Sequence, residues 1–187
     1  SMLGAVKMHF TDIEERLINM RSENLAQYKK ASNLLDEASD EVRKIAHDMT
    51  SGTLVRFGLH AALEELRLTI NSTEQLRFNL FIHGLDKRLK SGVEIELYRI
   101  VQESMSNILK HANASKVDVH LTLEYEDVTL LIEDDGDGFD PRKTAYGLGI
   151  KNMKQRVIKL DGFFKIDSSP GRGTTLIISV PNNEKND

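Results

Sequence analysis

The sequence has no cysteine among its 187 residues. This absence excludes a disulfide-stapled scaffold, zinc held by cysteines and a thiol nucleophile. No apolar run approaches the ~18–20 residues that span a bilayer, and no basic and apolar leader opens the chain. We therefore expect a cytoplasmic piece.

An excess of basic charge is also missing. Lys and Arg number 25 against 29 Asp and Glu, which gives a net charge of −4. Proteins that bind nucleic acid usually carry a basic patch, so we expect no nucleic-acid partner. The length suits one or two domains, and the 40% hydrophobic and 29% charged residues are ordinary for a globular protein.

Proline and glycine are scarce in the first two thirds of the chain. All three prolines follow residue 140, and seven of the 12 glycines fall between Gly136 and Gly173. The first part of the chain can therefore form long helices, whereas the last third must contain tight turns.

Apolar residues recur near the N-terminus at alternating spacings of three and four. They are Val6, Phe10, Ile13, Leu17 and Met20, then Ala31, Leu35, Ala38, Val42, Ile45 and Met49. This pattern predicts two helices in an antiparallel hairpin with one apolar face. Pairing two hairpins as a four-helix bundle would cover that face, so we predict a homodimer. The alternative is that the face packs on the same chain's second domain.

A polar patch at 71–74 follows a short helical pattern at 58–66 and suggests a linker. We therefore predict a helical domain over 1–66 and a second domain over 67–187. Within the second domain the patterns predict helices at 94–112 and 150–160, and strands at 76–83, 117–123, 128–132, 163–167 and 174–180. The expected fold class is α+β, with the hairpin followed by an α/β sandwich whose mixed sheet is covered by helices.

Four short motifs could carry chemistry, and the first lies on the helix at 94–112. Glu103, Asn107 and Lys110 follow at spacings of four and three and so share a helical face, with His111 beside them. A carboxylate, an amide and cations on one stripe can hold a divalent cation and phosphate oxygens together. The alternative is an ordinary solvated face.

The second motif leaves a strand through Asp134 and turns on Gly136 and Gly138. These glycines would let the backbone approach a ligand, and Asp134 could accept a hydrogen bond in a partly buried pocket. A calcium loop is the rival interpretation. It is disfavoured because Thr144 stands where the loop needs a bidentate Glu and because the flank is a strand.

The third and fourth motifs are glycine turns. Gly147 and Gly149 open the helix at 150–160, where free N–H groups can bind phosphate. Asn152 replaces the third glycine of a dinucleotide fingerprint, and no Walker-type P-loop occurs. The turn at 171–173 leads into Thr174, which could hydrogen-bond a ligand.

Taken in order, the four motifs resemble the N, G1, G2 and G3 boxes of the GHKL ATP-binding fold. This superfamily includes sensor histidine kinases, type II topoisomerases, mismatch-repair MutL proteins and a class of chaperone. The segments 98–103 and 107–112, together with Gly147 to Ile150, look like the two-component kinases of the nitrate-sensor and desaturase-thermosensor type. The segment 41–48, followed by Gly58-Leu59, looks like the end of their dimerisation helix, so the resemblance covers nearly the whole chain.

The resemblance implies a role for each motif residue. Asp134 would bind the adenine amino group, with Thr174 helping through water, and Asn107 would ligate magnesium. Lys110 and His111 would lie near the phosphates, and Glu103 matches the residue that activates water in the superfamily's hydrolases. The pocket and its short lid, Phe139 to Tyr146, would be shaped by glycines: Gly136, Gly138, Gly147 and Gly149.

The implied reaction moves the γ-phosphoryl group of ATP to a histidine, for relay to a response regulator aspartate. These kinases carry the acceptor in a His-Asp/Glu box on the first dimerisation helix, but here His9 precedes Phe10. His47-Asp48 resembles the box but ends the second helix. We therefore expect a fragment that binds ATP and Mg²⁺ but lacks its phosphoacceptor and does not autophosphorylate. The parent would carry a sensor, often anchored in the membrane in this family.

Two rival functions stay open. An anti-sigma-type serine kinase shares the ATP fold but lacks a long N-terminal hairpin. A non-catalytic dimeric adaptor with a degenerate nucleotide site would keep the hairpin but bind no nucleotide.

Overall fold

The computed structural model describes residues 52–85, 87–141 and 147–182. The predicted hairpin and its proposed dimer contact lie outside these residues. The compact unit that the structure describes begins at Gly52.

The unit is built on a five-stranded sheet with the strand order β1-β2-β3-β5-β4. β1 runs parallel to β2, and the other neighbouring pairs are antiparallel. The mixed sheet predicted from the sequence is thus confirmed. The strands are β1 Arg77–His83, β2 Lys116–Glu124, β3 Asp127–Asp134, β4 Phe163–Ser168 and β5 Thr174–Pro181.

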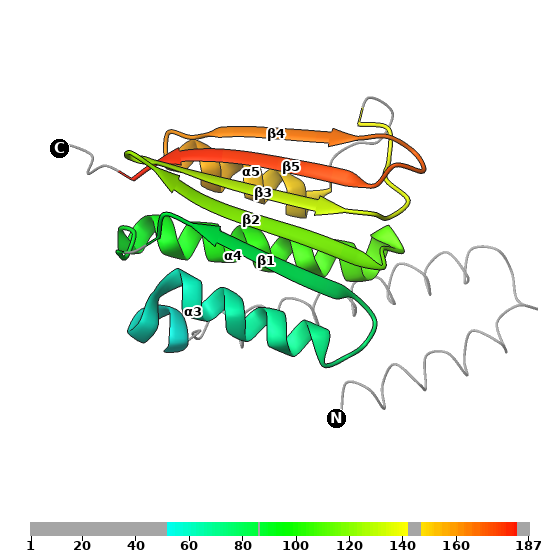
Figure 1. The fold of residues 1–187 in the computed structure, drawn as a ribbon. Helices are drawn as coiled ribbons and strands as arrows, with labels where there is room; N and C mark the ends of the chain where they lie inside the picture. The colour runs from blue at the N-terminus through cyan, green and yellow to red at the C-terminus, as the bar shows by residue number, and fades with distance from the viewer. Residues whose placement is uncertain (1–51, 86, 142–146, 183–187) are drawn as a thin grey trace, which may run out of the picture. The chain divides into compact units, whose positions relative to one another are not determined.

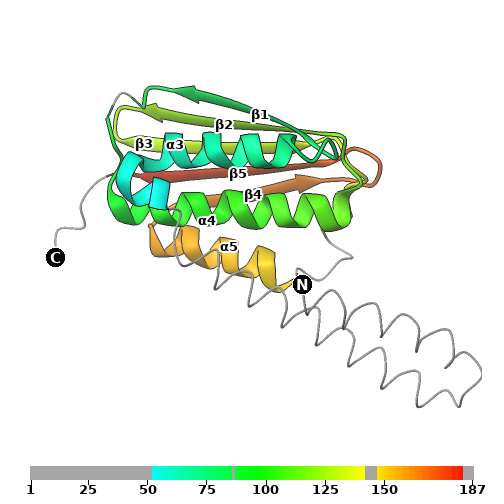
Figure 2. The same cartoon turned by 90° about the horizontal axis from the view of Figure 1, so that it is seen from below.

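Helices cover one face of this sheet. They are α3 Gly52–Asn71, α4 Ser91–Asn107, which continues as the π-turn η1 Ile108–Ala112, and α5 Leu148–Lys159. Figure 1 shows α4 and α5 behind the strands, and Figure 2 shows them below the strands; α3 lies next to β1 and α4. The helix predicted at 94–112 therefore exists, but its last turn is not α-helical.

The strands have one buried and one solvent-facing side, as their alternating residues predict. Val117, Val119 and Leu121 on β2 are fully buried, whereas Asp118 and His120 between them are partly exposed. On the outer face the ring of Phe81 stacks on that of His120, with centroids 4.5 Å apart. Only the inner face therefore contributes to the core.

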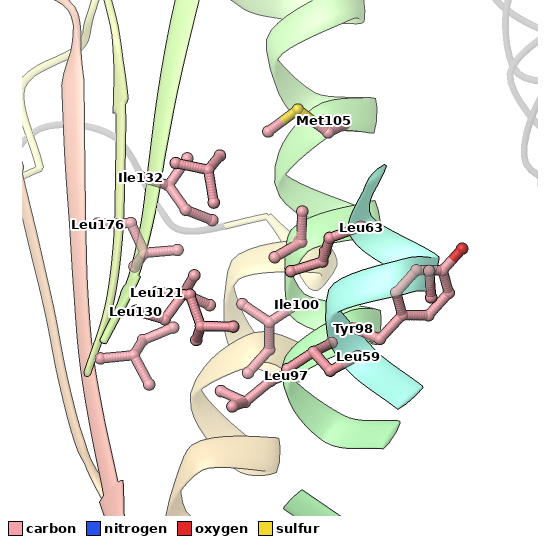
Figure 3. Close-up of a cluster of buried hydrophobic side chains, with 14 of the residues drawn as sticks. Leu59, Leu63, Leu97, Tyr98, Ile100, Met105, Leu121, Leu130, Ile132 and Leu176 are labelled. Carbon is pink, nitrogen blue, oxygen red and sulfur yellow. The ribbon is translucent and has the colours of Figure 1, made fainter. Parts of the chain in front are cut away.

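The core lies between the sheet and the helices. Figure 3 shows Leu59 and Leu63 of α3 and Leu97 and Ile100 of α4 turned toward side chains of the sheet, which include Leu121, Leu130, Ile132 and Leu176. All of these side chains are buried. Removing such side chains from water stabilises the fold by roughly 1.5–3 kcal/mol each.

The structure places the start of the second compact unit N-terminal to the predicted boundary. The sequence patterns predict a boundary after Leu66, but Leu59 and Leu63 of α3 are buried in the core of the compact unit. The polar patch read as a linker is a tight turn instead. There the Asn71 side chain accepts from Phe78 N–H at 2.7 Å and donates to the Phe78 carbonyl at 3.1 Å.

Candidate functional site

A cavity of about 450 Å³ opens between the end of α4, the sheet and the start of α5. Its polar lining comes from Ser104, Asn107, His111, Asp134 and Thr174. The rest of the wall is mainly apolar and includes Ile108, Ala112, Ile132, Phe139, Leu148, Ile150, Met153, Ile166 and Leu176. A large apolar pocket with a few convergent polar groups is the usual form of a small-molecule site.

The structure brings most of the predicted site residues to this cavity. The residues that line it are Asn107, His111, Asp134, Gly138, Gly147, Gly149 and Thr174. Glu103, Lys110 and Gly136 are not among the lining residues. The four motifs, which span residues 103–174 of the sequence, therefore meet at one place.

The π-turn explains the position of Lys110. Helical spacing predicted that Asn107 and Lys110 share a face, but Ile108 to Ala112 form i→i+5 hydrogen bonds. Because a π-turn holds more residues than an α-turn, Lys110 is rotated further from the side of Asn107 than an α-helix would place it, whereas His111 stays near that side. His111 lines the cavity, and Lys110 is exposed outside its wall. The predicted shared face is corrected accordingly.

Glu103 lies at the border of the cavity, against the start of α5. A Cβ on Gly149 would collide with Glu103 Oε1 and would lie 3.5 Å from Asn107 Nδ2. Glycine at this position therefore lets the backbone of α5 approach both side chains. Glu103 and Asn107, which were predicted to share a helical face, thus both lie against Gly149.

Asp134 ends β3 and stands opposite Thr174 of β5 in the sheet register. Its Oδ1 accepts the N–H of Gly136 at 2.9 Å. Burial raises the pKa of Asp134, although the Gly136 and Thr174 amides act in the opposite direction. The ionised carboxylate can only accept hydrogen bonds, so it offers acceptors at this end of the cavity.

The glycines of the second motif let this loop pack closely against neighbouring backbone. A Cβ at Gly136 would collide with the Ala112 carbonyl, which accepts the N–H of Asp137 at 2.7 Å. Gly138 has a φ of 60° and packs against the backbone of Ser169. Gly136 thus shapes the pocket by close packing rather than by lining it.

The acidic side chains of this loop bind the protein itself. The Asp135 carboxylate accepts from Ser115 N–H and Lys116 N–H at 2.8 Å and from the Ser115 hydroxyl at 2.6 Å. Asp137 accepts from Asn113 Nδ2 at 3.2 Å. Within residues 52–182, as far as the structure describes them, no group of three His, Asp or Glu could hold a metal ion. The carboxylates of Asp135 and Asp137 are therefore engaged by protein donors, and Thr144 of the calcium-loop alternative lies outside the described residues.

Sequence reasoning missed Ser104 and Met153 as lining residues. Ser104 lies one helical turn before Asn107, so the helical spacing could have found it. Its hydroxyl lies 3.4 Å from the Met153 sulfur on α5. His9, His47 and residues 142–146 of the predicted lid lie outside the described residues.

The comparisons with known proteins agree with this geometry. Residues 92–184 match the family described as histidine kinase-, DNA gyrase B-, and HSP90-like ATPase. This range contains all ten predicted site residues, from Glu103 to Thr174.

Curated relatives extend the likeness to nearly the whole chain. The signal transduction histidine-protein kinase/phosphatase DegS of Brevibacillus brevis is 32% identical over 174 residues, which cover 91% of this chain and 45% of the relative. The sensor histidine kinase LiaS of Bacillus subtilis is 29% identical and covers 96% of this chain and 48% of its own length. The chain therefore spans less than half the length of these relatives.

Solved structures share the fold. The histidine kinase AdeS of Acinetobacter baumannii aligns with a TM-score of 0.59 at 12% identity, over 97% of this chain and 96% of that one. The histidine kinase domain of the Erythrobacter litoralis EL346 blue-light activated kinase aligns with a TM-score of 0.56 at 16% identity, over 95% of each chain. None of the described helices has the length and apolarity to cross a bilayer.

Proposed function

Through residues 92–184 the chain belongs to the histidine kinase-, DNA gyrase B-, and HSP90-like ATPase family, and we propose that it is the ATP-binding catalytic region of a sensor histidine kinase. In this proposal the γ-phosphoryl group of ATP passes to a histidine and then to a response regulator aspartate. The observation that carries the proposal is the apolar cavity closed at one end by Asp134 and Thr174.

The chemistry of the cavity suits a purine base. Its walls are mostly apolar, and the Asp134 carboxylate supplies an acceptor for the exocyclic amino group of adenine. Asp134 is partly buried, so this hydrogen bond would form away from bulk water and would be stronger for it.

Another part of the lining suits the phosphates. Gly147 and Gly149 stand at the N-terminus of α5, where backbone N–H groups point outward and the helix dipole favours negative charge. His111 adds a side chain that can donate to phosphate oxygens. The N-terminus of α5 and His111 are thus the groups we assign to the phosphates.

Asn107 is the residue we assign to magnesium. Mg²⁺ in phosphate-transferring sites is held by one or two side chains and by the substrate's own phosphates, so a single amide oxygen beside the phosphate region fits it. The ion would neutralise phosphate charge there. Glu103, which meets Asn107 at Gly149, would orient this amide, and Lys110 would add positive charge nearby.

We extend the proposal to the partners. The predicted hairpin would join two copies of the chain, and a receiver domain of a response regulator would take the phosphoryl group. We also propose that this region works in the cytoplasm. The names of the relatives, sensor kinases among them, support these assignments.

Calorimetric titration of the chain with ADP and with a non-hydrolysable ATP analogue tests the proposal. We expect saturable binding at one site per chain, and tighter binding of the ATP analogue when Mg²⁺ is present. Absence of binding to either nucleotide would contradict it and would favour the adaptor function. Transfer of labelled phosphate from ATP to a serine of a partner would favour the anti-sigma type of kinase.

A further inference from the structure

Ser168 holds together three segments beside the cavity. It is the last residue of β4 and stands opposite Thr174 in the register of β4 with β5. Its side chain is buried, with the residue 8% exposed. The hydroxyl oxygen receives the Phe139 N–H at 2.9 Å, lies 3.0 Å from the Gly173 carbonyl oxygen and lies 3.1 Å from Thr174 Oγ1.

Counting protons fixes the direction of these hydrogen bonds. A serine hydroxyl has one proton and two lone pairs. The Gly173 carbonyl can only accept, so in the arrangement that makes all three hydrogen bonds at once the Ser168 proton is directed to it. The lone pairs of Ser168 then receive the Phe139 N–H and the Thr174 proton.

This arrangement decides what Thr174 offers to the cavity. With its proton directed at Ser168, Thr174 Oγ1 presents lone pairs to a ligand. The neighbouring Asp134 carboxylate is an acceptor as well, and the two residues are opposite each other in the sheet. This end of the cavity therefore carries two acceptors side by side.

We propose that Ser168 is a positioning residue for purine specificity: it makes Thr174 an acceptor and so selects a base with an exocyclic amino group over one with a keto oxygen. The inference rests on the proposed nucleotide-binding function. A keto oxygen would face two acceptors and gain no donor. A site built to pair one polar group discriminates strongly against an analogue that lacks it.

Without Ser168 the Thr174 hydroxyl is free to rotate. It can then donate to a keto oxygen, and the penalty against the keto base falls. Loss of the Ser168 hydroxyl should therefore weaken the discrimination between the two bases, in addition to any general loss of affinity.

Calorimetry on the full chain with ADP and inosine 5′-diphosphate, which carries a keto oxygen in place of the amino group, tests this. We expect the unaltered chain to prefer ADP by at least about tenfold, the equivalent of one hydrogen bond. Ser168→Ala should reduce this preference about fivefold or more. Thr174→Val should reduce it similarly, while Thr174→Ser, which keeps the hydroxyl, should preserve it.

The double variant separates positioning from a purely structural role. If Ser168 acts through the Thr174 hydroxyl, Ser168→Ala should change the preference no further in a Thr174→Val background. An unchanged preference in Ser168→Ala, or an equal shift in both backgrounds, would overturn the inference. If Ser168→Ala fails to fold, an unchanged preference in Thr174→Val alone overturns it. Failure of the unaltered chain to bind ADP would instead contradict the proposed function itself.

Discussion

Arg88 and Glu94 meet at the kink of α3, where Arg88 Nη2 lies 2.6 Å from Glu94 Oε2. The Glu94 side chain is 3% exposed, whereas that of Arg88 is 49% exposed. The same guanidinium donates to the carbonyls of Leu54 and Val55. One ion pair thus joins the first turns of α3 to the start of α4.

Replacing Glu94 should therefore destabilise the compact unit. Glu94→Ala removes charge-assisted hydrogen bonds to Arg88 and the acceptor near Leu59 N–H, and we expect a loss of about 1–3 kcal/mol in the free energy of unfolding. Glu94→Gln keeps an acceptor oxygen and should lose less. Urea denaturation of both variants measures the difference, and equal stability of Glu94→Ala and the unaltered chain would contradict this role.

A side chain at position 58 should destabilise the compact unit. Its φ of 88° and ψ of −179° belong to a region that is essentially restricted to glycine. A Cβ there would lie 3.0 Å from Arg88 Nε and 3.2 Å from Glu94 Oε1. We expect Gly58→Ala to lower the free energy of unfolding by about 1–3 kcal/mol. Gly92→Ala is the matched control, since a Cβ there meets nothing within 4 Å, and its stability should stay the same or rise.

Asp134→Asn should remove nucleotide binding and leave the fold intact. The change replaces an acceptor by a group that also donates, at the position we assign to the adenine amino group. We expect ADP affinity to fall by about 100-fold or more in calorimetry, on the order of a lost charge-assisted hydrogen bond. Glu133→Gln is the control, because Glu133 is exposed on the outer face of the same strand. Unchanged affinity in Asp134→Asn would refute the assignment of the pocket.

The stability that Glu96 contributes through its ion pairs with α5 should depend on pH. Burial acts to raise the pKa of Glu96, but the hydrogen bonds and charges of Arg156 and Lys159, at 2.6 Å and 3.1 Å, outweigh it and lower that pKa. A carboxyl with a lowered pKa stabilises the fold above its unfolded pKa and loses this effect as the pH falls.

Glu96→Gln should thus be less stable than the unaltered chain at pH 7. The difference in stability between the two proteins should narrow as the pH falls below about 4.3, the ordinary pKa of a glutamate. Thermal unfolding of both proteins between pH 7 and pH 3 measures this gap. A gap that stays constant with pH would show that the ion pairs contribute nothing.

Charges placed in the hairpin seam should separate the proposed dimer. Leu35→Glu combined with Val42→Glu puts carboxylates at two apolar positions that we expect at the interface. Burying unpaired charges there would be costly, so sedimentation should find monomers. A dimer that persists would place the interface elsewhere in the chain.

The sequence predicted the sheet and the gathering of the motifs because both depend on local patterns. Alternation at Val117, Val119 and Leu121 fixes which face of β2 is buried. Asp134 lies at a strand end and Gly147 at a helix start, and their positions follow from those elements. Thr174 joins them because β5 pairs with β3.

Features that depend on tertiary contacts could not be predicted from the sequence. Counting on an α-helix cannot reveal the π-turn, so the sequence could not show that His111 lines the cavity while Lys110 stays outside its wall. Ser168 looks like any turn residue until β4 and β5 bring it beside Thr174. The helical pattern from Gly58 to Leu66 did not indicate that its apolar face packs on α4 and β1. The domain boundary was therefore predicted after that segment.

Because helices cover only one face of the sheet, the two faces should tolerate substitutions unequally. On β2, β3 and β5 the residues that face the helices are buried and fully committed to packing, while their neighbours face outward. A complete set of single substitutions along these strands should therefore show tolerance that rises and falls with a period of two residues. Neutral substitutions can therefore accumulate on the outer face, which carries Phe81 and His120 near its β1 edge, without altering the residues that line the site.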